Sequence, residues 1–210
     1  MLSGQYSKFG GVCLADQVQK TSLKNTLVQL ENTVNNVNSN DSGYWTSAYE
    51  SYICSDTAKT GHMKKIILRT NTLLEQDDPS HHILFMFKSY NTECTENDYA
   101  SKSRTDNSKT IVLCKAYNNL HVTNNDQFGI SKLQTLAGYV TAIAIDGLHD
   151  NGELREIANT PLSKEECKNR ASVCSSEADF SQGFCLSYFL QEVDLQNKVV
   201  GAASIEFQNE

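Results

Sequence analysis

The chain has 210 residues and lacks any long apolar segment, its longest such run extending only from Ile83 to Phe87. A helix that crosses a bilayer needs roughly 20 apolar residues, so no membrane span is predicted. The first residues, Met1-Leu2-Ser3-Gly4-Gln5, also lack the basic and apolar regions of a signal peptide. We therefore expect either a cytosolic protein or a sequence that starts at a mature or trimmed end.

Positive charge is scarce as well. The chain has 18 Lys and Arg residues against 25 Asp and Glu residues, which gives a net charge of -7. Nucleic acids and anionic membranes attract positively charged surfaces. We therefore predict that neither is a partner.

Motifs for cofactors, metals and common nucleophiles are absent too. The sequence contains no P-loop, no glycine-rich dinucleotide fingerprint, no GxSxG and no CxxC pair. His81 and His82 are adjacent, so on a strand they would point to opposite faces and could not share a metal ion. We predict no cofactor and no metal site.

Seven cysteines are spread along the chain. We predict up to three disulfides and one spare thiol, in an oxidising compartment, with buried free thiols as the alternative. Two of the cysteines, seven positions apart, cannot bond on one continuous helix, because the rise there is about 10.5 Å. The predicted protein is secreted or extracytoplasmic. The disulfide candidates are Cys54, Cys94, Cys114, Cys167, Cys174 and Cys185.

Two segments are predicted to be helical, and residues 130–138 are interpreted as one or two further helical turns. Residues 16–37 carry leucines and valines at alternating spacings of four and three, which is a one-sided helical stripe. An Asn-rich linker ends this helix. Ser163 and Glu166 have the spacing of a capping box, so a second helix is predicted over 163–173.

Most of the remaining sequence is interpreted as strands. We predict an α+β fold: an N-terminal helix, then a meandering antiparallel sheet, curled or barrel-like, with a helix inserted late. Residues 1–41 would form a tail, helix and linker, and residues 42–210 a single β-rich domain. The predicted strands are 42–54, 65–74, 82–90, 110–117 and 139–145, followed by a hairpin that pairs 184–190 with 199–207.

The stretch Gly43-Tyr44-Trp45 resembles the GxW signature that opens the first strand of lipocalins. In that family the tryptophan plugs the closed end of an eight-stranded barrel. Thr105-Asp106-Asn107 is similar to the second signature, although Asn107 stands where the family has an aromatic residue. The resemblance implies an interior pocket for a small apolar ligand.

These patterns favour a non-catalytic binding protein for a small apolar ligand or a partner macromolecule. The expected ligand-binding residues are Trp45, Tyr188, Gly201 and Ala203, because the small residues leave space beside the predicted hairpin. One alternative is a hydrolase that pairs a cysteine with a histidine, such as Cys13 with His149. Another is a protein-interaction or effector module that uses the N-terminal helix.

Overall fold

Helices, not strands, make up most of the structure. The computed structural model describes residues 11–13, 15–39, 43–57, 60–75, 83–87, 94–95, 98–102, 109–122, 130–146, 162–174 and 183–206. The α-helices in these ranges are α1 (Gln17–Ser39), α2 (Gly43–Tyr52), α3 (Thr60–Glu75), α4 (Lys132–Asp146), α5 (Lys164–Ser172) and α6 (Gly183–Glu206). The predicted meandering or barrel-like sheet is therefore wrong.

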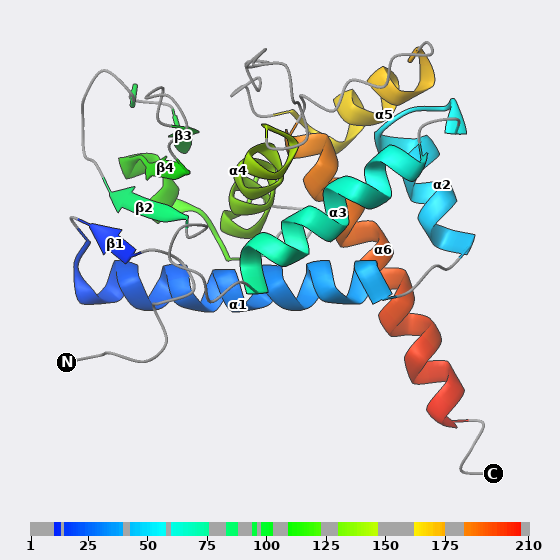
Figure 1. Ribbon diagram of the computed structural model, residues 1–210, viewed down its shortest axis with the longest axis horizontal. Coiled ribbons are helices and arrows are strands. Elements are labelled where there is room, and N and C mark those ends of the chain that lie inside the picture. Colours follow the sequence, from blue (N-terminus) through cyan, green and yellow to red (C-terminus); the bar gives the residue numbers. More distant parts are fainter. Residues whose placement is uncertain are drawn as a thin grey trace.

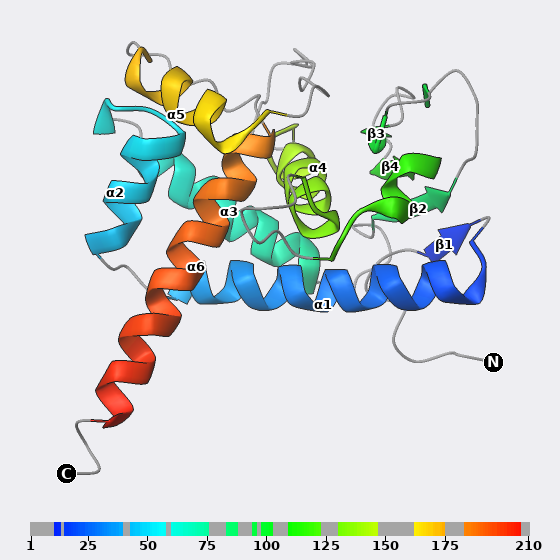
Figure 2. The ribbon, with the colours of Figure 1, turned by 180° about the vertical axis from the view of Figure 1, so that it is seen from behind.

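The helix α1 runs along one side of the molecule (Figure 1). Helices α3, α4 and α6 pack against it, and α6 also packs against α2 and α4. The sheet lies at one end of α1 and helices α2 and α5 lie at the other, as both views show (Figures 1 and 2). The last part of α6 extends past α1, away from the other helices.

The sheet is small and mainly parallel. Its strands are β1 (Gly11–Cys13), β2 (Leu84–Phe87), β3 (Ala100–Lys102) and β4 (Thr110–Leu113), in the order β1-β2-β4-β3. β2 pairs in parallel with both β1 and β4, and only β3 is antiparallel to its neighbour. The short 3-10 helix η4 (Lys115–Asn119) follows β4. The predicted strands at 82–90 and 110–117 thus contain real strands, in a different kind of sheet.

Two predicted strands are helices because their buried residues have helical spacing. In α2 the buried residues are Trp45, Ala48, Tyr49 and Tyr52, at relative positions 0, 3, 4 and 7. The aromatic residues in this stretch favour strands by propensity, but packing on one face decides the outcome. Gly43-Tyr44-Trp45 therefore opens a helix, and the implied lipocalin barrel is not present. In the same way, residues 65–74 lie in α3.

The other two errors concern α4 and the first part of α6, which are buried on nearly every side. Every residue of α4 from Lys132 to Ile145 is buried, and so is every residue of α6 from Phe184 to Leu190. Such a helix shows no apolar stripe, so periodicity cannot distinguish it from a buried strand. The predicted strand at 139–145 lies in α4. The predicted terminal hairpin is wrong, because its segments, as far as Glu206, belong to the single helix α6.

The two helices that were predicted are confirmed. The stripe on α1 buries Leu23, Leu27, Leu30, Val34 and Val37. These side chains join residues of the other helices and the sheet in one apolar core. α5 begins with the predicted capping box, in which Ser163 and Glu166 bond each other's backbone N–H groups.

Three disulfides join the six candidate cysteines: Cys54 with Cys174, Cys94 with Cys114, and Cys167 with Cys185. Cys167 and Cys174 do not bond each other, as the helix geometry required. Three disulfides are compatible with an extracellular location. Among the helices of the described ranges, none combines the length and apolar character needed to cross a membrane.

Candidate functional site

An open groove lies where α2, α5 and α6 meet. It has a volume of about 250 Å³. α2 contributes one wall, α5 contributes two lysines, and α6 contributes a glutamate and a glutamine. The residues that line it are Tyr44, Ser47, Ala48, Ser51, Tyr52, Lys164, Lys168, Glu192 and Gln196.

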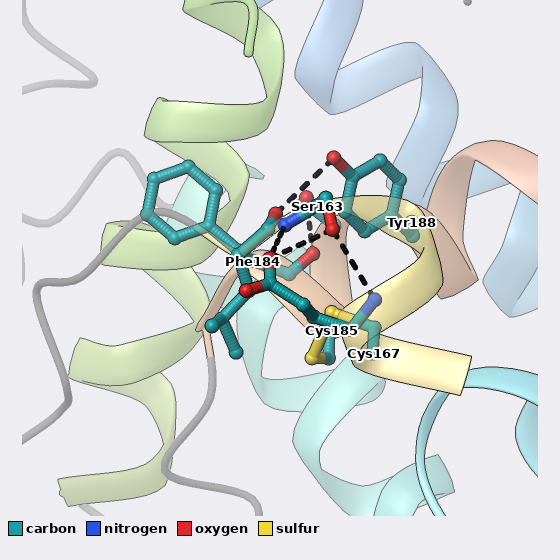
Figure 3. The surroundings of a disulfide bond; sticks show 8 residues. Ser163, Cys167, Phe184, Cys185 and Tyr188 are labelled. Carbon is teal, nitrogen blue, oxygen red and sulfur yellow. Dashed lines mark hydrogen bonds between the residues drawn. A yellow bond between two sulfur atoms is a disulfide. The ribbon is translucent and has the colours of Figure 1, made fainter. Parts of the chain in front are cut away.

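Two disulfides tie together the three helices that form this groove. Cys54, just after α2, bonds Cys174, just after α5. Cys167 in α5 bonds Cys185 in α6, close to Ser163 and Tyr188 (Figure 3). The backbone N–H of Ser55 also donates a hydrogen bond of 3.0 Å to the carbonyl of Ala171. The two disulfides therefore limit how far the walls of the groove can move apart.

The ring of Tyr52 is at the centre of the groove's contacts. It stacks on Tyr188 with ring centroids 6.1 Å apart. The Tyr188 hydroxyl donates a hydrogen bond of 3.3 Å to the carbonyl of Leu162, which fixes Tyr188 against the start of α5 (Figure 3). Burial, followed by the charge of Glu192, raises the pKa of Tyr52 above its usual value. Tyr52 is therefore a neutral hydrogen-bond donor at physiological pH.

Glu192 accepts hydrogen bonds from three side chains. Tyr52 donates at 3.2 Å and the Lys164 ammonium at 3.4 Å to Oε2, and Gln196 donates at 3.4 Å to Oε1. Partial burial would raise the pKa of Glu192. The hydrogen bonds and the positive charge of Lys164 outweigh that effect, so the pKa lies below the ordinary glutamate value. Glu192 is therefore ionised at neutral pH and joins α6 to α2 and α5.

Two lysines lie on the same face of α5, four residues apart. The Nζ atoms of Lys164 and Lys168 are each 5.9 Å from the centroid of the Tyr52 ring. This is the distance range of a cation–π contact. Lys164 also forms the ion pair with Glu192. Lys168 is exposed, and within the described ranges no carboxylate pairs with it.

Two of the four predicted ligand-binding residues, Trp45 and Tyr188, are buried in the core. Trp45 is 3% exposed and packs edge-on against Phe189, with ring centroids 5.1 Å apart. Tyr188 is 6% exposed and lies beneath Tyr52. Both are core residues of the α2–α6 contact. Gly201 and Ala203 lie on the helical backbone of the last part of α6, and their role stays a prediction.

The predicted hydrolase pair of Cys13 and His149 stays a prediction, because neither side chain lies among the described ones. Cys13 belongs to β1, but its side chain is outside the described residues, and so is all of His149. The other six cysteines are bonded in disulfides. Among the described residues, no cluster of His, Cys, Asp and Glu has the arrangement of a metal site.

None of the nine residues that line the groove was among the predicted ligand-binding residues. One usable signal was present: the capping box begins a helix at Lys164, which places Lys164 and Lys168 on one face. The remaining members depend on tertiary packing of α2 against α6, which no local pattern contains. Comparisons with protein-family models and with curated proteins find no match to this chain.

Proposed function

We propose that the protein is a secreted or extracytoplasmic, non-catalytic binding protein that holds a segment of a partner protein in the α2–α5–α6 groove. One observation carries this proposal: the three helices that line the groove are the ones that Cys54–Cys174 and Cys167–Cys185 join. A site fixed in this way loses little conformational entropy when it binds. Covalent support of one surface is expected where that surface must keep its shape.

The groove suits part of a macromolecule better than a small apolar ligand. Its volume of about 250 Å³ is below the roughly 300–1,000 Å³ of typical small-molecule sites. Ala48 is the one aliphatic residue in a lining otherwise made of tyrosine, hydroxyl, charged and amide side chains. Trp45, the predicted plug of an apolar pocket, is packed between Tyr49 and Phe189. A few side chains of a docked segment would fill the available space.

The groove is also a better docking surface than the apolar stripe of α1. That stripe is buried in the core, with Leu23, Leu30 and Val34 at 0% exposure. A partner could reach it only if the core opened. This observation favours the groove over an interaction module built on the N-terminal helix.

The test is selection from a random-peptide phage library on the immobilised full chain with its disulfides intact. Ser47 lines the groove and is exposed, whereas its neighbour Thr46 is exposed on α2 outside the groove. We expect selected peptides to bind Ser47→Trp about tenfold or more weakly than the wild type, because the indole fills the groove. Thr46→Trp, which adds the same side chain one position away, should leave binding unchanged. Peptides that bind both variants like the wild type would contradict the proposal.

A further inference from the structure

We infer that the segment held in the groove presents a carboxylate, from an aspartate or glutamate side chain, to Lys168. This inference rests on the proposed function and names the chemistry of the partner. The reason is that Glu192 is already hydrogen-bonded within the protein, whereas Lys168 is not paired with a carboxylate of the described residues.

The negative charge among the lining residues belongs to Glu192, and side chains of the protein itself already bond it. Glu192 accepts from Tyr52, Lys164 and Gln196, and a carboxylate has about four acceptor sites. Its side chain is 30% exposed. These three donors occupy most of those sites, and the charge of the carboxylate is already paired with the Lys164 ammonium. Glu192 therefore does not favour a lysine or arginine of the partner.

The positive charge of Lys168 is not paired with any carboxylate of the described residues. Its ammonium group has three donors, and its contact within the described chain is with the face of the Tyr52 ring. That ring is held from below by Tyr188 and at its hydroxyl by Glu192. The Tyr52 ring thus holds the Lys168 ammonium beside the groove. The N–H donors of this ammonium can still bond an acceptor of a partner. A carboxylate makes the strongest hydrogen bonds to such a group.

The groove is locally positive on an acidic protein. Its lining contains two lysines and one glutamate, a net charge of +1, whereas the whole chain carries -7. Long-range attraction of an acidic segment is therefore weak. The recognition must come from short-range contacts with Lys168 and with neighbouring donors, such as the hydroxyl groups of Ser47 and Tyr44.

Peptides selected on the full chain test this inference. We expect the peptides whose binding is weakened by Ser47→Trp to be enriched in Asp or Glu. Lys168→Gln should weaken their binding about threefold to tenfold, measured by fluorescence anisotropy. Lys65→Gln, which removes the same charge from an exposed position of α3, should have no effect. Replacing the acidic residue of the peptide by its amide should reproduce the loss, without a further loss when combined with Lys168→Gln.

The outcomes separate this inference from the proposed function. The carboxylate inference is overturned if the peptides whose binding Ser47→Trp weakens are neutral or basic. It is also overturned if Lys168→Gln and Lys65→Gln weaken their binding equally. In both cases the groove remains a peptide site. If the selection yields no peptide that Ser47→Trp blocks, both are overturned.

Discussion

The α2–α5–α6 region and the sheet region are both cross-linked, but their disulfides join different kinds of partners. Cys54 and Cys174 are 120 residues apart and connect the ends of two helices. Cys94 and Cys114 are 20 residues apart and form a small cluster with Val112 of β4. In the helical region, Cys54–Cys174 holds together two elements that are distant in the sequence, and Cys167–Cys185, with a separation of 18 residues, closes a shorter loop. In the sheet region, the cross-link reinforces a local contact.

Removing Cys54–Cys174 and, in a second variant, Cys94–Cys114 tests this difference most strongly. We expect Cys54→Ser with Cys174→Ser to lower the free energy of unfolding by about 5 kcal/mol, and Cys94→Ser with Cys114→Ser by about 3 kcal/mol. The reason is that the longer loop gains more conformational entropy in the unfolded chain. Urea denaturation followed by circular dichroism measures both.

The Cys94–Cys114 disulfide serves as the matched control, because each of the two pairs includes at least one cysteine that is almost fully buried. The loss of buried sulfur therefore contributes to both variants. Equal losses, or a larger loss for Cys94–Cys114, would show that loop length does not set the stability of the helical region.

The contact between α1 and α6 sharpens the comparison, because a polar cluster holds it without a disulfide. Asp194 is 8% exposed. It accepts hydrogen bonds from Asn36 and Lys198, each at 2.6 Å, and from Thr33 at 3.4 Å. Asp194→Ala leaves Thr33 and Asn36 without this acceptor at a buried interface, and we expect a loss of about 2–3 kcal/mol in the free energy of unfolding.

Glu192→Ala is the control for Asp194→Ala. It removes a carboxylate two positions away on the same helix, at the partly exposed groove, and we expect a loss below about 1 kcal/mol. Thermal and urea denaturation of both variants give the comparison. A larger loss for Glu192→Ala would mean that the groove, and not the α1–α6 contact, stabilises α6.

The elements that could be predicted from the sequence are those with a local signal. α1 has a one-sided apolar stripe, and α5 has its capping box. The six bonded cysteines were also identified, although their pairing depends on the fold. The last part of α4 and the first part of α6 could not be recognised from periodicity, because residues 139–145 and 184–190 are buried on every side and have no polar face to mark a helical period.

α2 and the groove show a second reason for failure. The spacing of Trp45, Ala48, Tyr49 and Tyr52 is helical, but aromatic residues and threonine favour strands by propensity. Once α2 is mistaken for a strand, Tyr52 cannot be placed beside α5 and α6. The groove then remains hidden, because Tyr52 is the residue that contacts both lysines and Glu192.

The start of α5 offers a smaller test of how the groove's walls are held. The hydroxyl of Ser163 accepts a hydrogen bond of 3.2 Å from the backbone N–H of Glu166. Ser163→Ala removes this cap, and we expect a loss of about 1 kcal/mol in the free energy of unfolding. Ser172→Ala, at the other end of the same helix, removes a hydroxyl that caps no N–H group and should cost less. If Ser163→Ala has no effect, the disulfides alone hold α5 in place.

The smallest expected effect is the pH dependence that Glu192 gives to the helical region. Its pKa in the folded protein is below that of the unfolded chain, despite the opposing effect of burial. Its stabilising contribution is therefore fully present above the unfolded pKa and is lost as the pH falls through the folded pKa. Because the side chain is 30% exposed, the contribution should stay below about 1 kcal/mol.

Nuclear magnetic resonance titration of the Glu192 carboxyl group measures this pKa directly, and we expect a midpoint below that of an ordinary glutamate. Lys164→Gln should move the midpoint upward, since it removes a positive charge and a donor. Lys168→Gln should move it less, because Lys168 contacts the Tyr52 ring and not the carboxylate. Equal shifts from the two lysines would mean that Glu192 and Lys168 interact directly, and Lys168 would then not be left over for a partner's carboxylate.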